Sequence, residues 1–421
     1  MQRRQLLSAS LGLGLAGLEA APASSQPGCE IPAPDARFPG ADLANLNDVI
    51  TGIACEGRMS MSFLDPRWKS LEAWKKAARP FLRGLMHYEP RARPLSAEMV
   101  RTEERDGFRL EEVTIRATAA YDIPATVLIP SGAKVRRPGL IAIHCHSGRY
   151  VWGREKIISQ PGESPVLTEF RERAYGRPYA ETLAKRGFVV LSIDGFYFGA
   201  RRLRPERMDP ADAVPTARAR LKELAALEPG SGPWLQMVNA LCSEFEHLTA
   251  KTIFSAGATW PGILAWDDRR SVDYLLSRPE VDPQRIGCLG LSIGGLRTGH
   301  LIATDPRIRV ASVTGWMTEF RSQLRNHLRN HTWMIYVPGL YGAMDLPDAA
   351  ALHAPGALLV QQCSRDALYP MAGMKGAVEK LARLYKKAGV PERFKSAFHD
   401  VPHSFTPAMQ EEAFAWIEKW I

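Results

Sequence analysis

The stretch 285–295 constrains what this chain can fold into more than any other part of the sequence. Its apolar first half ends at Leu291 and is typical of a buried strand, whereas the segment from Gly294 onward can continue as a helix. Ser292 stands between them and forms the pattern Gly-x-Ser-x-Gly with Gly290 and Gly294. A sharp strand-to-helix turn strains the backbone of such a serine and leaves little room for side chains two residues away. The pattern therefore predicts a nucleophilic serine at the end of a strand.

The rest of the chain predicts an α/β fold with a mostly parallel sheet covered by helices on both faces. Continuous apolar runs at 140–144 and 187–193 are typical of strands buried on both sides, and a candidate crossover helix, 179–185, separates them. An antiparallel hairpin is expected before them, over 108–117 and 123–130. Strand-like and helix-like segments then alternate to the end of the chain, as in a parallel sheet. The later strands are expected at 308–313, 357–361 and 394–398.

The sequence divides into three expected parts. Residues 1–23 resemble a twin-arginine export signal, because paired arginines precede a moderately apolar run and a small-residue cleavage site; an ordinary secretory signal is the alternative. Residues 24–105 are expected to form a loose lead-in, to about residue 60, and then a helical cap, since apolar residues recur at helical spacing over 66–88. Residues 106–421 are expected to form the catalytic domain. The apolar run is too short for a permanent membrane span, so we expect an exported protein, periplasmic or secreted, without a membrane anchor.

Three stretches are longer than ordinary connections. They are 149–177, 196–260 and 316–355, and each follows the carboxyl end of an expected strand. In open α/β sheets this edge holds the ligand crevice. We therefore expect these insertions to form the rim of the site. Their candidate rim residues, each equally compatible with simple packing, are Tyr150, Trp152, Trp260, Trp316, His327 and Trp333.

An acid and a histidine follow Ser292 in the order that a catalytic triad on this kind of sheet requires. A serine hydroxyl becomes a nucleophile when an imidazole takes its proton, and a carboxylate must orient that imidazole. Asp366 lies just beyond the expected strand 357–361, and His403 lies between the strand 394–398 and the last helical segment. We therefore expect Ser292, His403 and Asp366 to form the triad.

Alternatives to this acid and this base remain open at the sequence level. His399 could replace His403, but it lies at the end of a strand, where a structural role is favoured. Asp400 could replace Asp366, but it is too close to the histidine in sequence to come from the preceding strand. Asp194 also ends a strand and is expected to fix the following loop by local hydrogen bonds.

Hydrolysis of an ester also needs backbone donors for the oxyanion. The amide of Ile293, directly after the nucleophile, is the first expected donor. The second is expected from the loop after the strand 140–144, with the amide of His146 favoured and that of Ser147 next.

The histidine pairs do not indicate a metal site. His144 and His146 lack an evident third ligand, and His327 and His331 lack the accompanying glutamate of a zincin motif. A rim or substrate-contact role is expected for the second pair. We expect neither a metal nor an organic cofactor.

The net charge does not by itself indicate a nucleic-acid partner. It is +9 at pH 7, in a chain with 45% hydrophobic and 24% charged residues, the composition of an ordinary globular protein. No recognition helix, zinc module or aromatic RNA-binding motif is evident. We interpret the basic excess as a solvated surface, or as a field that steers an anionic substrate.

The cysteines do not form a disulfide scaffold, since the chain has six in 421 residues. Cys145, Cys288 and Cys363 lie at or near strand ends and are expected to be small core residues. Cys29 and Cys55 can form a disulfide after export.

Several stretches carry a family resemblance: 144–148, 153–156, 266–275, 279–287, 290–295 and 337–340, with Asp366 and His403. Together these motifs resemble the α/β-hydrolase superfamily and, within it, exported esterases of the acetyl xylan esterase-like and dienelactone hydrolase-like kind. The resemblance covers 108–421. It implies a serine esterase acting on small acyl esters, which can include esters on a carbohydrate, through the triad named above. This chain departs from its relatives in one place: they often have Gly at the position of Cys145 and Gly-Gly at the positions of Ser147 and Gly148. The departure leaves the identity of the second oxyanion donor open, but not that of the nucleophile.

Two other functions fit the same motifs. One is a prolyl-oligopeptidase-like serine peptidase, although no propeller repeat precedes residue 108. The other is a non-catalytic binding protein on the same fold. The expected partner is a small-molecule or glycan-borne ester, with no nucleic acid, and the oligomeric state is open.

Overall fold

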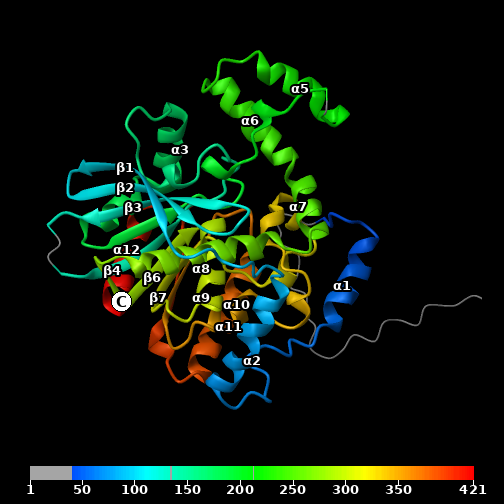
Figure 1. Ribbon diagram of the computed structural model, residues 1–421. Coiled ribbons are helices and arrows are strands. Elements are labelled where there is room, and N and C mark those ends of the chain that lie inside the picture. Colours follow the sequence, from blue (N-terminus) through cyan, green and yellow to red (C-terminus); the bar gives the residue numbers. More distant parts are fainter. Residues whose placement is uncertain (1–39, 133–134, 212) are drawn as a thin grey trace, which may run out of the picture.

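The computed structural model describes residues 40–132, 135–211 and 213–421 (Figure 1). The predicted export signal, residues 1–23, lies outside these ranges. Within them, no helix is both long enough and apolar enough to cross a membrane.

One nine-stranded sheet runs through the described part of the chain. The strands are β1 (Ala97–Arg105), β2 (Phe108–Arg116), β3 (Asp122–Pro130), β4 (Arg137–Ile143), β5 (Val189–Ile193), β6 (Val281–Leu291), β7 (Val310–Thr314), β8 (Ala357–Cys363) and β9 (Phe394–His399). Their order is β1-β2-β3-β5-β4-β6-β7-β8-β9. The pairs β1–β2, β2–β3 and β3–β5 are antiparallel, and every neighbouring pair from β5 to β9 is parallel. The predicted mostly parallel sheet and the hairpin of β2 and β3 are confirmed.

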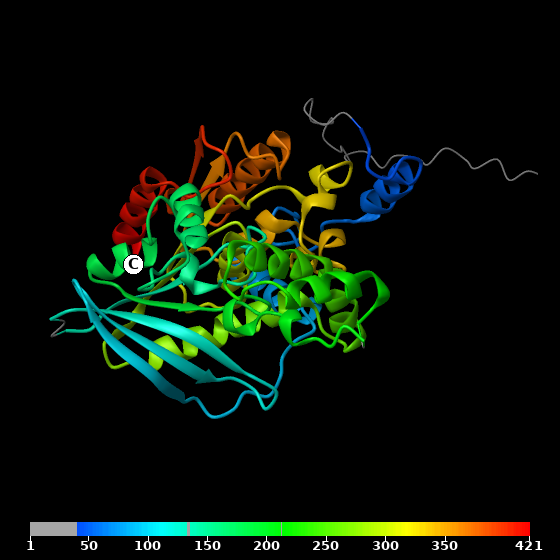
Figure 2. The same ribbon diagram turned by 90° about the horizontal axis from the view of Figure 1, so that it is seen from above.

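Helices cover both faces of this sheet (Figures 1 and 2). They are α1 (Leu46–Glu56), α2 (Leu71–Leu85), α3 (Pro165–Tyr175), α4 (Tyr179–Lys185), α5 (Pro215–Ala225), α6 (Gly232–Glu244), α7 (Glu246–Ser255), α8 (Trp260–Ser277), α9 (Ile293–Thr304), α10 (Leu346–Ala351), α11 (Met371–Lys387) and α12 (Pro407–Trp420). The predicted crossover helix is α4, between β4 and β5. The prediction of helices on both faces is confirmed.

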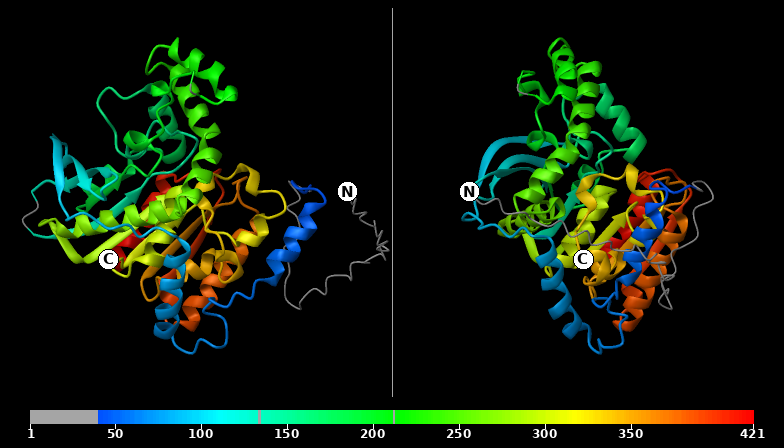
Figure 3. Two further views of the ribbon diagram at one scale, coloured as in Figure 1. Left: turned by 45° about the vertical axis from the view of Figure 1, so that its right-hand side comes forward. Right: turned by 90° about the vertical axis from the view of Figure 1, so that its right-hand side faces the viewer.

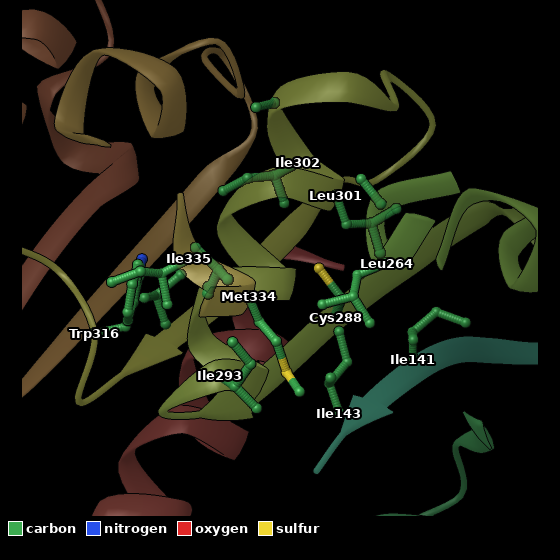
Figure 4. Close-up of a cluster of buried hydrophobic side chains, with 14 of the residues drawn as sticks. Ile141, Ile143, Leu264, Cys288, Ile293, Leu301, Ile302, Trp316, Met334 and Ile335 are labelled. Carbon is green, nitrogen blue, oxygen red and sulfur yellow. The ribbon is translucent and has the colours of Figure 1, made fainter. Parts of the chain in front are cut away.

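Two hydrophobic cores lie on the two faces because successive side chains of a strand point in opposite directions. In β4, Ile141 and Ile143 belong to the first core and Leu140 belongs to the second. Helices α8, α9 and α11 contribute to the first core, and α3, α4 and α12 to the second. Figure 4 shows part of the first core, where Ile293 at the start of α9 lies near Met334 among side chains from β4 and β6.

The sheet begins before residue 106, the expected start of the catalytic domain. Strand β1 pairs along most of β2, with a register shift between Met99 and Arg101. Its sequence, 97–105, is polar, and its side chains are exposed or half-buried. Because only Ala97 of β1 packs against a core, the alternation of apolar residues that reveals a strand is absent there.

The helix expected over 66–88 is present as α2. Its apolar face buries Trp74, Ala78 and Leu82. Arg79 Nε donates a hydrogen bond of 2.9 Å to the carbonyl of Ala303, in the last turn of α9. Since a helix rises about 1.5 Å per residue, α2 lies roughly 15 Å away from the start of α9. The helix expected to lie against the main domain therefore packs at the far end of α9, away from Ser292.

The described part of the expected loose lead-in contains the helix α1. None of its side chains is buried, and Leu46, Val49 and Ile53 are exposed. A hydrogen bond of 2.9 Å from the amide of Asp42 to the carbonyl of Arg325 ties the preceding segment to the rim insertion 316–355. The helix was missed because the surrounding Pro, Ala and Gly residues outweighed the helical spacing of these apolar residues.

The three long insertions follow the carboxyl ends of β4, β5 and β7, as expected. The first contains α3, the second contains α5, α6 and α7, and the third contains α10 with short 3-10 turns. Figure 3 shows α5 and α6 projecting from the body of the molecule. These insertions surround one edge of the sheet.

The cysteines behave as expected where the structure describes them. Cys145, Cys288 and Cys363 are buried and free, as is Cys242. Cys55 is disulfide-bonded. Its expected partner, Cys29, lies outside the described residues.

Candidate active site

Ser292 occupies the predicted strained turn between β6 and α9. Its backbone has φ 63° and ψ −122°, in the region that side-chain-bearing residues rarely adopt. The Ser292 amide donates to the carbonyl of Thr314 at 2.9 Å, which joins the turn to the end of β7. A Cβ on Gly294 would lie 2.5 Å from the carbonyl oxygen of Ile143, and one on Gly290 would lie 2.6 Å from the backbone of Gly294. The sharp turn and its need for glycine on both sides are confirmed.

The structure joins Asp366 to His403 and brings them to this turn. His403 Nδ1 donates a hydrogen bond of 2.5 Å to Asp366 Oδ2. The Asp366 side chain is buried, directly after β8. Gly315 follows Thr314, and a Cβ there would lie 3.3 Å from His403 Cε1. The imidazole therefore packs over the end of β7, next to the strand that ends at Ser292.

A cavity of about 340 Å³ lies over these residues. Ser292 and His403 both line it. His403 Nε2 has no hydrogen-bond partner among the described residues, Ser292 included, so this nitrogen remains able to accept a proton. The walls of the cavity also include Ile293, Trp316, Ile335, Leu368 and Tyr369.

A larger groove of about 870 Å³ runs along α2, away from this site. Basic and acidic side chains of α2, such as Lys76 and Glu72, line it together with Pro355. The described residues that line it include no serine, cysteine or histidine. The smaller cavity at Ser292 is therefore the candidate active site.

The alternative acid and base lie in less suitable places. His399 Nε2 bonds to Glu412 at 3.1 Å. The Asp400 side chain is 85% exposed and pairs with Arg365. Asp194 is fully buried and fixes the following loop, as expected, by accepting from the amide of Ala200 at 3.0 Å.

Both expected oxyanion donors belong to residues that line this cavity. Ile293 begins α9, and His146 lies in the loop after β4. Ser147 and Gly148 have φ of 53° and 62°, so the loop turns back on itself beside Ser292. The amide of Cys145 is not available, because it donates to the hydroxyl of Tyr175 at 3.0 Å.

Comparison with known proteins identifies this architecture. No protein-family model matches the chain. It is 25% identical over 333 residues to a Bacillus subtilis (strain 168) protein named as a hydrolase, YtaP, with 79% of this chain and 95% of that protein covered. Solved structures similar to it include one named as an acetyl xylan esterase from Bacteroides fragilis, with TM-score 0.63, 14% identity and coverage of 83% of this chain and 81% of the other. Another is a glucuronoyl esterase from Solibacter usitatus, with TM-score 0.55, 16% identity and coverage of 82% and 93%. The fold is that of the α/β-hydrolases.

The histidines on the loop after β4 of this α/β-hydrolase sheet are engaged in structural hydrogen bonds. His144 donates from Nδ1 to the carbonyl of Cys145 at 3.0 Å and accepts at Nε2 from the amide of Gly195 at 3.1 Å. Burial holds the pKa of His144 well below its usual value, so it is neutral. His146 accepts at Nδ1 from the amide of Gly148 and donates from Nε2 to Glu246. Neither ring has a nitrogen left for a shared metal.

Three of the six expected rim residues line the site. Tyr150 and Trp316 line the cavity at Ser292. Trp333 lines an adjoining cavity of about 430 Å³, which shares Tyr150 with the first. The other three, Trp152, Trp260 and His327, line neither of these two cavities.

These three residues serve in packing. Trp260 is completely buried and packs against Tyr197, with ring centres 5.1 Å apart. Trp152 packs against the second core, and His327 is buried beside Asn326. A tryptophan near a strand end can face either the crevice or the core, and neighbours distant in sequence decide which.

Glu246 is a site residue that the sequence reading missed. This buried carboxylate accepts from His146 Nε2 at 2.8 Å, Tyr150 Oη at 2.7 Å and Thr332 Oγ1 at 3.0 Å, and from the amide of Trp333 at 3.4 Å. Burial acts to raise the pKa of Glu246, but the hydrogen bonds from His146, Tyr150 and Thr332 outweigh it and hold the pKa below its usual value. Glu246 thereby joins the loop after β4, α7 and the third insertion.

His331 and Tyr369 also line the cavity. Burial lowers the pKa of His331 to about 4, so its ring is neutral and donates from Nε2 to the carbonyl of Leu368 at 3.1 Å. The rings of His331 and Tyr369 lie 5.1 Å apart. The sequence analysis expected a rim or substrate-contact role for His331, whereas the only signal for Tyr369 was its position three residues after Asp366.

Proposed function

We propose that this chain is a serine hydrolase that cleaves carboxylic esters through Ser292, His403 and Asp366. The observation that carries the proposal is the bond from His403 Nδ1 to Asp366, which leaves Nε2 without a partner on a residue that lines the same cavity as Ser292. Ser292 stands on the strained turn that presents a serine side chain above a sheet. The relatives and similar structures named as hydrolases and esterases support the same reaction class.

In the first half of the reaction, Ser292 Oγ attacks the ester carbonyl carbon while His403 Nε2 takes the hydroxyl proton. The carbonyl π electrons move to oxygen and form a tetrahedral oxyanion. The buried Asp366 carboxylate stabilises the imidazolium and keeps the ring in the tautomer that receives the proton at Nε2. When the intermediate collapses, the bond to the alcohol breaks, and His403 returns the proton to the departing alkoxide.

In the second half, water attacks the acyl-enzyme while His403 again takes a proton. Collapse of the second oxyanion breaks the bond to Ser292 Oγ, which regains its proton, and the carboxylic acid leaves. The amides of Ile293 and His146 are the proposed donors to both oxyanions. Each such donor contributes roughly 10²–10³-fold to kcat in hydrolases of known mechanism.

The two joined cavities favour esters with a small acyl group. The acyl part would occupy the cavity of about 340 Å³, among the apolar side chains of Trp316, Ile335 and Leu368. The alcohol part would extend into the adjoining cavity of about 430 Å³, where Trp333 is 38% exposed. An exposed indole beside polar groups suits a sugar ring, which agrees with the carbohydrate esters in the names of the similar structures.

The decisive test is Ser292→Ala assayed with 4-nitrophenyl esters of increasing acyl length and with matched amides. We expect wild type to prefer the shortest acyl esters over the amides and Ser292→Ala to lose this turnover while keeping its unfolding temperature. Ser277→Ala, a serine bonded only within the last turn of α8, is the control and should retain wild-type rates. Full turnover in Ser292→Ala would refute the mechanism, and preference for the amides would make the chain a peptidase.

We further propose that residues 1–23 direct export by the twin-arginine route, on the strength of the paired arginines. The measurement is whether these residues carry a reporter that folds in the cytoplasm across the inner membrane. Export that continues after Arg3 and Arg4 are both changed to lysine would refute this route.

A further inference from the structure

The segment Gly153–Lys156, after β4, has no role in the mechanism so far. It ends in the 3-10 turn η1 (Arg154–Lys156), and the Lys156 side chain is completely buried. Lys156 Nζ donates to the carbonyl of Cys145 at 2.8 Å and to that of His146 at 3.1 Å, and it lies 4.5 Å from the ring centre of Phe198. None of the salt bridges among the described residues involves this ammonium. A buried charge without a counterion is unfavourable, so a specific task would account for it.

The turn that carries Lys156 is held in place by contacts with the buried Asp194. Arg154 forms an ion pair of 2.6 Å with the buried Asp194, and its amide donates to the same carboxylate at 3.0 Å. A Cβ on Gly153 would lie 2.1 Å from Asp194 Oδ1, so a glycine is required there. Glu155 accepts from the amide of Gly153 at 2.9 Å. The first three residues of the segment therefore fix the turn from which Lys156 extends.

Lys156 binds the carbonyls of the two peptide groups that carry the amides of His146 and Ser147. In a trans peptide the C=O and N–H bonds point in opposite directions. The carbonyl of Cys145 shares its peptide with the amide of His146, and the carbonyl of His146 shares its peptide with the amide of Ser147. One ammonium that gathers both carbonyls therefore directs both amide hydrogens to its opposite side. His146 and Ser147 both line the cavity at Ser292.

We propose that Lys156 is a positioning residue for the oxyanion site: its ammonium orients the peptides of His146 and Ser147 and strengthens their amides as donors. A cation on a carbonyl polarises the peptide, and hydrogen bonds in such a chain reinforce one another. The inference rests on the proposed hydrolysis at Ser292 and assigns the second oxyanion donor to a loop that Lys156 shapes.

The charge of Lys156 is itself titratable near neutral pH. Burial lowers its pKa to about 8, while Cys145, Glu155 and Asp194 act to raise it and Arg149 acts to lower it. Below this pH the group is an ammonium, and above it the group is a neutral amine that polarises the carbonyls less. The proposal therefore predicts that kcat falls as pH rises through about 8. The titratable and charged groups that face Lys156 are His144, Cys145, His146, Arg149, Arg154, Glu155 and Asp194.

The test compares Lys156→Met, Lys156→Arg and Lys75→Met with wild type, measuring kcat and KM for 4-nitrophenyl acetate from pH 6 to 10. Lys75 is the matched control, because its Nζ also bonds to a backbone carbonyl, that of Ala354, and burial also lowers its pKa to about 8, but it lies on α2. We expect Lys156→Met to lower kcat roughly 10²-fold at nearly constant KM and to remove the fall near pH 8. Lys156→Arg should restore much of kcat and move the fall upward, because a guanidinium stays charged. Lys75→Met should keep the wild-type profile.

Wild-type kcat in Lys156→Met, or an unmoved fall near pH 8 in Lys156→Arg, would overturn the proposal. The arginine variant decides the matter if circular dichroism shows that the methionine variant is unfolded. Ser292→Ala in the same assay separates the two hypotheses. Its inactivity together with a fully active Lys156→Met refutes only the role of Lys156, whereas its full activity refutes both.

Discussion

At the scale of single residues, the proposed site depends on one strained serine and on the hydrogen bond between His403 and the buried Asp366. Ser292 adopts a φ of 63°, which costs free energy that the surrounding structure must supply. His403 receives its orientation from Asp366, whose other oxygen accepts from the amide of Leu368 at 2.8 Å. Since that amide fixes the carboxylate, the ring of His403 has one preferred tautomer, with the proton on Nδ1. The order of these three residues along the chain was visible in the sequence, because each follows a strand of the same sheet edge.

Asp366→Asn tests this pair. We expect the asparagine amide to favour the wrong tautomer of His403 and to lower kcat roughly 10⁴-fold, with KM and the unfolding temperature nearly unchanged. Steady-state kinetics with 4-nitrophenyl acetate measure the effect. The exposed Asp400→Asn is the matched control, and a similar loss in that variant would assign the acid to the wrong residue.

At the scale of elements, three segments far apart in sequence meet at Glu246 on α7. Its partners His146 and Tyr150 are separated from it by 100 and 96 residues, and Thr332 by 86. No periodicity or motif marks such a contact, since it forms only when the insertions have folded over the sheet edge. Strand β1 escaped detection because its side chains are exposed or half-buried, so no alternation of apolar residues marks a strand that pairs with β2.

Glu246→Gln tests the hydrogen bonds by which Glu246 joins these segments. The pKa of Glu246 lies below its usual value, so the ionised form stabilises the fold above its unfolded-state pKa of about 4.3, and this stabilisation is lost as pH falls through the lower folded-state value. We expect the glutamine variant to lose about 1.5–3 kcal/mol of unfolding free energy at pH 7. The difference from wild type should shrink below pH 4. Denaturant unfolding at several pH values measures it, with the partly exposed Glu244→Gln as control; an equal loss at every pH would contradict the charged role.

At the scale of the whole molecule, the cavity at Ser292 and the packing helix α2 lie at opposite ends of α9. Ser292 lies at the start of α9, whereas α2 packs against its end through Arg79 and Ala303. The large groove along α2 lies at the end of α9 that is away from Ser292. Stability and chemistry therefore occupy opposite ends of one helix.

Leu82→Ala tests this separation. Leu82 is completely buried on α2, so its truncation should cost about 2–5 kcal/mol of unfolding free energy. Because α2 does not reach the cavity at Ser292, kcat and KM at 25 °C should stay at wild-type values in the folded variant. Thermal unfolding and steady-state kinetics on the same preparation check both statements. A large change in KM would show that α2 affects substrate binding at Ser292.

Local pattern alone determined the turn at Ser292, the alternating strands and helices, and the strand ends that carry Asp366 and His403. These features depend on hydrophobic spacing and on glycine at positions where a Cβ would collide, and both can be read along the chain. Only the tertiary structure decided that Glu246 and Lys156 hold the loop of His146 and that Trp260 packs inward. Such contacts depend on how separate insertions fold over one another, and the burial of a side chain between two distant segments leaves no periodic trace in either of them.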